Sequence, residues 1–162
     1  MLSNCARDGD SNVVMSQRPP ERLSEFARRL LHHEAEAAQQ ADDFAAGFER
    51  VCRALNDCLT PLISSPGFHT LFARALKLAA RDFPFLAGVS VSTNGDCGLP
   101  GLARITETRT SGEVGDALTL ALANFIWLLV IFIGENLALR KVREVWPEVP
   151  LDSMNRSSGA GR

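Results

Sequence analysis

The residues of this 162-residue chain best suited to bind a metal ion are two adjacent histidines and the acids that follow them. His32 and Glu36 are four positions apart, so a helix would place their imidazole and carboxylate on one face. A zinc site needs three or four ligands, however, and besides His33 the chain has only one further histidine, His69. We therefore expect a solvated helix end here, with no metal ion and no other cofactor.

The four cysteines show neither metal-site spacing nor the surroundings of a nucleophile. Cys52 and Cys58 are six positions apart, off a common helix face, and no His or Asp is spaced to activate either thiol. Cys5 and Cys97 are expected in tail or loop segments. Because the N-terminus lacks an apolar stretch typical of a secretory signal, we expect a cytoplasmic protein whose thiols stay reduced.

Composition and the remaining motif exclude further classes of function. The glycine-rich segment 95–101 (GDCGLPG) lacks the Lys-Ser/Thr pair of a phosphate-binding loop and does not open a helix, so it is expected to form turns. A net charge of −2 gives no basic field for nucleic acid. No set of residues resembles a catalytic site, and we expect a protein that is not an enzyme.

Apolar residues at three- and four-residue steps predict three amphipathic helices. The first begins at Pro20 and reaches at least His33, with a composition that allows it to continue through 34–43. The second ends before Pro61, and the third covers 66–81 with Ser65 as its N-cap. We expect one helical domain at 20–147, between a flexible arm at 1–19 and a disordered tail at 148–162.

The segment 85–112 is irregular. Asn94-Gly95 is a hairpin signal, and Val89 and Val91 alternate with serines as in a half-buried strand. A two-stranded hairpin is marginal alone, so a loop is the favoured prediction and a small hairpin the alternative.

The most informative segment is Ala117–Ile133, which contains no charged residue. No proline follows until Pro147, and the pattern predicts one helix from Ser111 or Asp116 to that residue, about 30 residues and about 45 Å long. The expected fold is therefore all-α, a bundle of about four helices with one long, very hydrophobic C-terminal helix.

Such a helix must be covered, either by lipid or by protein. The apolar run is at the short limit for a membrane span. The basic residues after it, Arg140, Lys141 and Arg143, would hold its C-terminal end in the cytoplasm. The part of the chain before the run would then have to be exported. Three shorter helices are too few to cover the whole rod, so we favour a homodimer and keep membrane association as the alternative. The predicted dimer or membrane interface is Asn124, Phe125, Trp127, Leu128, Leu129, Ile131 and Phe132.

Polar residues near this helix leave alternatives open. Asn124 could pair with its copy across a twofold axis or bond to a neighbouring backbone carbonyl. Glu135 is either solvated or paired with Arg74 or Arg81. A strip of Arg74, Lys77 and Arg81 could face another protein, although solvation alone would explain it.

Two stretches, 66–76 (PGFHTLFARAL) and 132–147 (FIGENLALRKVREVWP), resemble uncharacterised helical proteins of bacterial genomes. This resemblance implies a soluble, helical, bacterial protein and carries no assigned activity. The layout of an apolar helix wrapped by amphipathic ones also looks like that of Bcl-2-type and pore-forming proteins, in architecture only. The expected function is a homodimeric interaction or regulatory module, with a membrane-inserting helical protein as the alternative.

Overall fold

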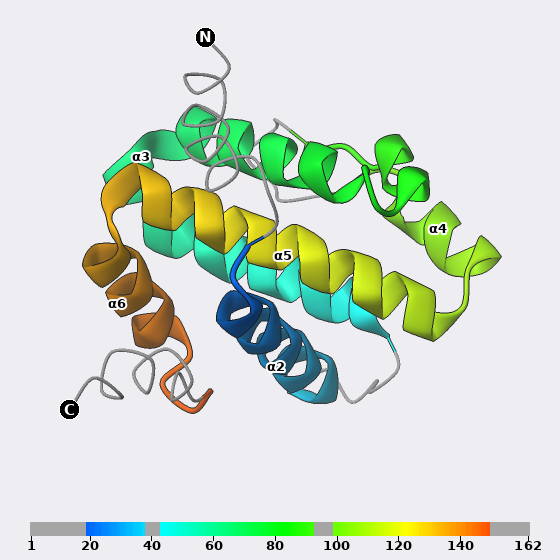
Figure 1. Ribbon diagram of the computed structural model, residues 1–162, viewed down its shortest axis with the longest axis horizontal. Coiled ribbons are helices and arrows are strands. Elements are labelled where there is room, and N and C mark those ends of the chain that lie inside the picture. Colours follow the sequence, from blue (N-terminus) through cyan, green and yellow to red (C-terminus); the bar gives the residue numbers. More distant parts are fainter. Residues whose placement is uncertain (1–18, 38–42, 93–98, 150–162) are drawn as a thin grey trace, which may run out of the picture.

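The computed structural model describes residues 19–37, 43–92 and 99–149, and within them the chain is helical with no strand. The elements are α2 (Glu21–Ala37), α3 (Phe44–Ala79), the 3-10 helix η1 (Pro84–Gly88), α4 (Leu102–Thr108), α5 (Ser111–Ile133) and α6 (Glu135–Val145). The prediction of an all-α bundle is confirmed. Figure 1 shows α5 running through the middle of the bundle, with α2, α3 and α6 around it.

Helix α5 lies at the centre because it is apolar on all sides and contacts both α2 and α3. Its first turn is capped by Thr110, whose Oγ1 accepts a hydrogen bond of 3.2 Å from the Glu113 N–H. At its middle, the ring of Phe125 lies 5.2 Å from that of Phe68 and 5.1 Å from that of Phe72. This aromatic contact holds α5 against the C-terminal half of α3.

Helix α3 bends at Ser64, whose φ of 65° and ψ of 163° are not helical. The helix continues past Pro61 to Ile63, so the predicted end before Pro61 is wrong by three residues. The Ser64 Oγ accepts a hydrogen bond of 3.2 Å from the Gly67 N–H, which makes Ser64, and not Ser65, the cap of the second half. The bend lets one continuous element cover two different sides of α5.

The predicted single C-terminal helix is wrong, because the chain leaves helical geometry at Gly134. The φ of 95° and ψ of 149° at this residue are accessible to glycine and strained for other residues. The long apolar helix is therefore α5, and α6 is a separate helix that folds back along the bundle (Figure 1). Folding back buries Ala138 and Val142, the apolar face of an amphipathic sequence that a straight helix would leave in water.

Specific polar contacts fix α6 between the first two helices. The Trp146 indole N–H donates a hydrogen bond of 2.7 Å to Glu34 of α2, whose other oxygen accepts from Arg50 of α3 at 2.8 Å. On the α3 side, the Cys58 Sγ lies 3.5 Å from the Lys141 backbone oxygen. The last described helix thus closes the bundle against the first two.

The segment predicted as a loop or hairpin contains two short helices, η1 and α4, which the sequence interpretation did not anticipate. Between them, residues 89–92 form no regular secondary structure, and the Ser90 N–H donates a hydrogen bond of 3.2 Å to the Pro100 oxygen. The proposed turn at Asn94-Gly95 lies outside the described residues.

Other predictions also fall outside the part of the chain that the structure describes. They are the flexible arm, apart from residue 19, the extension of the first helix beyond residue 37, Cys5, Cys97, and the tail from residue 150. Val149, within the predicted tail, is buried, so the packed chain extends beyond Pro147.

Candidate functional site

Most of the predicted interface residues belong to the core. Phe125 and Leu129 are fully buried and Leu128 is 8% exposed, while Trp127 is partly buried. The α3 bend and the return of α6 together supply more cover for α5 than three straight helices would. In the folded chain Phe125, Leu128 and Leu129 are therefore covered, and Trp127 contributes only part of its side chain to the surface.

Asn124 is also inside the bundle, at 3% exposure. Its Nδ2 lies 3.5 Å from the Ala75 oxygen of α3, which agrees with the backbone-carbonyl alternative. A pair across a twofold axis would need this side chain at the surface, and it is not there.

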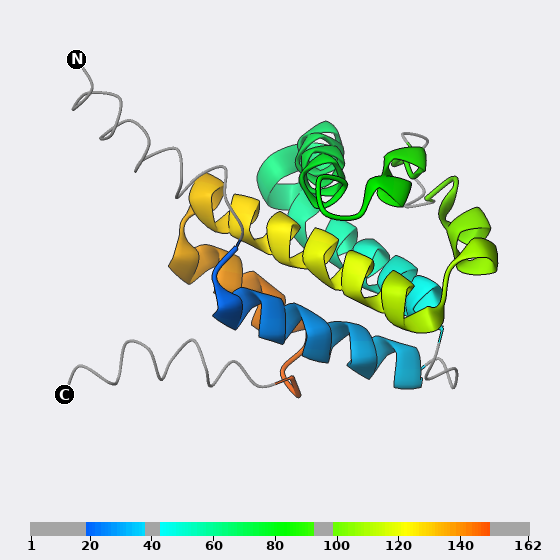
Figure 2. The same ribbon diagram turned by 45° about the vertical axis from the view of Figure 1, so that its right-hand side comes forward.

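The two remaining predicted residues, Ile131 and Phe132, are exposed by 41% and 63%. The third large apolar side chain that the described surface exposes is Leu62, at 43%, in the turn of α3 before the bend. Figures 1 and 2 place the α3 bend and the C-terminal end of α5 at the same end of the bundle. We call Leu62, Ile131 and Phe132 the apolar end.

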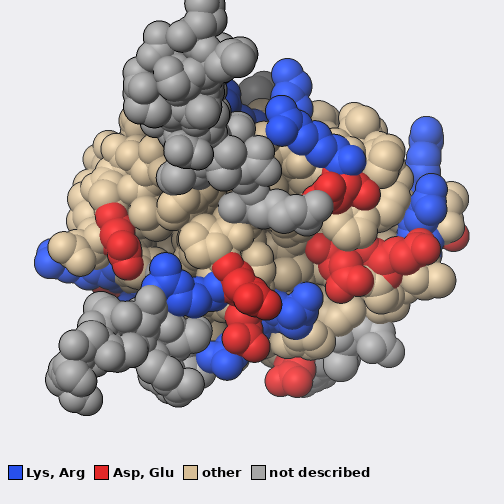
Figure 3. All heavy atoms as spheres, in the orientation of Figure 1, with Lys and Arg blue, Asp and Glu red and all other residues tan. Residues whose placement is uncertain are grey.

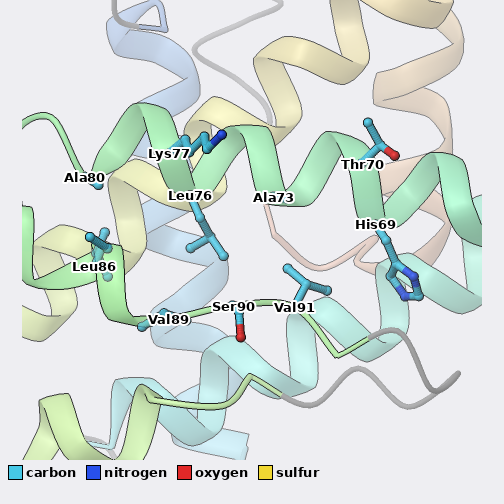
Figure 4. A pocket seen from close by; sticks show the side chains of 11 residues that line it. His69, Thr70, Ala73, Leu76, Lys77, Ala80, Leu86, Val89, Ser90 and Val91 are labelled. Carbon is cyan, nitrogen blue, oxygen red and sulfur yellow. The ribbon is translucent and has the colours of Figure 1, made fainter.

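A second feature, which the sequence interpretation missed, is a groove of about 540 Å³ between the C-terminal half of α3 and the segment 86–91. We call it the α3 groove. It is lined by His69, Thr70, Ala73, Leu76, Lys77, Ala80, Leu86, Ala87, Val89, Ser90 and Val91. Figure 4 shows His69 and Thr70 toward one end, Leu86 and Ala80 at the other, and Lys77 next to Leu76, nearer the Ala80 end.

The polar side chains of the groove, His69, Thr70, Ser90 and Lys77, are spread along its length. His69 Nε2 is buried and has no hydrogen-bond partner within the described chain. Lys77 is exposed, and no carboxylate among the described residues lies within ion-pair distance of it. No acidic side chain lines the groove, so its only formal charge is positive.

The predicted basic strip lies along this half of α3. Arg74, Lys77 and Arg81 are all exposed, and only Lys77 lines the groove. Glu135 is exposed and forms no ion pair with Arg74 or Arg81 within the described structure, which agrees with the solvated alternative. On the face shown in Figure 3, basic and acidic side chains are interspersed, without a large field of one sign.

The histidine and acid cluster of α2 is used in packing and ion pairing. His32 packs edge-on against Phe44 with ring centres 5.0 Å apart, and His33 Nε2 lies 3.4 Å from Glu148 Oε1. Among the described residues, no group of three or more His, Cys, Asp or Glu side chains is arranged to hold a metal ion. Glu36 lines a shallow depression there with the two histidines.

The described cysteines are placed for packing. Cys52 is buried in the core, and Cys58 is partly buried between α3 and α6. Burial raises the pKa of the Cys58 thiol, and the nearby Lys141 opposes this only in part. A raised pKa disfavours the thiolate, which is the nucleophilic form.

The chain matches no family model, and neither a curated protein nor a solved structure is similar enough to it to count as a match. By length and composition, one helix of the described residues, Ser111–Ile133, is apolar enough to cross a membrane. Within the bundle, 61% of its most apolar stretch is buried, as in the core helix of a soluble protein.

Proposed function

We propose that this protein is a non-enzymatic helical interaction module that forms a homodimer through its apolar end. The supporting observation is the exposure of Phe132, Ile131 and Leu62 at one end of a bundle whose other large apolar side chains are mostly covered. An aromatic ring exposed by 63% is a typical anchor for a protein partner. Two copies meeting end to end would cover these side chains on both protomers.

The exposed area predicts a weak association. Completing the burial of the three side chains would gain about 3 to 4 kcal/mol per protomer, or about 7 kcal/mol per dimer. Loss of translational and rotational freedom costs about 4 to 15 kcal/mol. The proposal requires a cost at the lower end of this range, where the contact leaves about 3 kcal/mol and a Kd of about 6 mM.

The experiment is sedimentation equilibrium of the full chain over a wide concentration range without detergent. We expect a monomer–dimer equilibrium around the monomer mass of 17.6 kDa, shifted to monomer by Phe132→Asp. Thr106→Asp, on the exposed surface of α4, is the matched control and should leave the equilibrium unchanged. A chain that stays monomeric at millimolar concentration, or a Phe132→Asp variant that still dimerises, would contradict the proposal.

A second candidate function, membrane association, is favoured by one observation. The exposed Ile131 and Phe132 lie in the last turn of α5, at the end of its uncharged stretch, so this apolar surface could enter a bilayer first and the helix follow. Flotation of the chain with vesicles of neutral phospholipid tests this. Vesicle binding that is lost in Phe132→Asp, together with a monomer in solution, would favour the membrane function over the dimer.

A further inference from the structure

The α3 groove is a second surface, separate from the apolar end, and it has the composition of a small-molecule site. Its volume of about 540 Å³ lies within the range of about 300 to 1,000 Å³ typical of ligand pockets. The lining is mainly aliphatic, from Ala73, Leu76, Leu86, Val89 and Val91, and its polar groups are few. Such a surface favours a ligand that is largely hydrocarbon.

The polar groups of the groove define the other part of the ligand. Lys77 has no acidic partner in the described structure, and the exposed Arg74 lies three residues before it in α3. The buried Nε2 of His69 has no partner within the described chain, although buried polar atoms are normally hydrogen-bonded. An anionic head beside Lys77 would accept a hydrogen bond from its ammonium group, whereas His69 lies eight residues, about 12 Å, away along α3.

We propose that the α3 groove binds a medium-chain carboxylate, a single-chain fatty acid in its free form. The carboxylate lies beside Lys77, and the aliphatic chain runs from there over Leu76 and Ala73 toward Val91 (Figure 4). A two-chain phospholipid would need more space than this groove provides, which is why we assign a free acid and not a bilayer lipid. This site is independent of the homodimer proposed above, because none of its residues belongs to the apolar end.

The first test is calorimetric titration of the full chain with hexanoate, octanoate and decanoate below their micelle-forming concentrations. Because each buried methylene contributes about fourfold in affinity, we expect binding to strengthen about 15-fold from octanoate to decanoate. Absence of binding for all three acids, or an affinity independent of chain length, would overturn the proposal.

The second test places the ligand. Ala73 is exposed on the groove surface, so Ala73→Phe fills the groove without disturbing the core and should abolish decanoate binding. Phe132→Asp should leave binding unchanged. If Phe132→Asp lost decanoate binding and Ala73→Phe retained it, the acid would bind at the apolar end and the groove site would be overturned. The homodimer is tested separately, by sedimentation equilibrium.

The third test identifies the contact with the head group. Lys77→Gln should weaken decanoate by about three- to tenfold and leave decanol, which has the same chain without the charge, unaffected. Arg53→Gln removes an exposed charge from the other half of α3 and serves as the matched control. An equal loss for decanoate and decanol, or an equal effect of Arg53→Gln, would remove Lys77 from the site and overturn the assignment of a carboxylate.

Discussion

Replacing Gly134 by alanine should destabilise the fold, because the break between α5 and α6 depends on a backbone conformation that favours glycine. At φ 95° and ψ 149°, a residue with a Cβ is strained by about 1 to 3 kcal/mol. No neighbouring atom lies within 4 Å of the position that the Cβ would take, so the whole cost comes from the backbone. Alanine also lowers the conformational entropy of the unfolded chain, which offsets about 0.4 to 1 kcal/mol of this strain.

The backbone cannot relieve the strain at position 134 without losing other interactions. Straightening α5 and α6 into one helix would satisfy the alanine but would expose Val142 and break the hydrogen bond from Trp146 to Glu34. Burial of the valine alone is worth about 1.5 kcal/mol or more, comparable to the strain itself. We therefore expect Gly134→Ala to lower the free energy of unfolding by about 1 to 2 kcal/mol while the bundle stays intact.

The assay is urea unfolding followed by circular dichroism and tryptophan fluorescence. Gly112→Ala is the matched control, since this glycine is helical and exposed, and no atom lies within 4 Å of the place that a Cβ would occupy. Alanine there should be neutral or stabilising by up to about 1 kcal/mol. Equal stability of Gly134→Ala and the unsubstituted chain, with unchanged fluorescence, would refute the reasoning.

Further predictions concern buried and partly buried polar groups. Glu34→Ala leaves the Trp146 indole N–H without its partner and should lower the free energy of unfolding by about 1 to 3 kcal/mol, measured by urea unfolding. Asn124→Leu removes only a long hydrogen bond to Ala75, so it should change the free energy of unfolding by about 1 kcal/mol or less. It should also leave the monomer–dimer equilibrium in sedimentation unchanged. A loss of the dimer in this variant would support the pair of Asn124 side chains across a twofold axis instead. Because the pKa of Cys58 is raised, its alkylation should be slow near neutral pH and should still accelerate above the usual thiol pKa, as followed by peptide mass spectrometry. The raised pKa of Cys58 also makes the free energy of unfolding depend on pH. The contribution of the protonated thiol is fully present below the ordinary thiol pKa and is lost as the pH rises through the raised pKa of the folded state, which thermal unfolding as a function of pH would measure.

The helices were predictable where the apolar pattern and burial agree. The stripes of Leu23, Phe26 and Leu30 in α2, and of Phe48, Val51 and Leu55 in α3, are buried as their spacing indicates. The break at Gly134 was not predictable from these patterns, since glycine is also tolerated within helices. What decides the break is the tertiary gain from burying Ala138 and Val142, and this depends on where α2 and α3 lie.

The burial of Phe125, Leu128 and Leu129 was not predictable for a related reason. The sequence shows that α5 is apolar all round, but how much of it α3 covers depends on the bend at Ser64. The α3 groove forms because residues 86–91 return past Ala73 and Leu76, and no local sequence pattern specifies how close the two segments lie. The exposed Ile131 and Phe132 were within the predicted set because they end the apolar run.

The central position of α5 also has a consequence for biosynthesis. The two helices that it contacts most, α2 and α3, precede it in the chain, so a ribosome exposes them to solvent before the apolar segment emerges. The helix with the greatest tendency to aggregate is thus released next to surfaces already available to cover it. Moving α5 ahead of α2 by circular permutation would reverse this order, and we expect the permuted chain to depend more strongly on chaperones for its soluble yield.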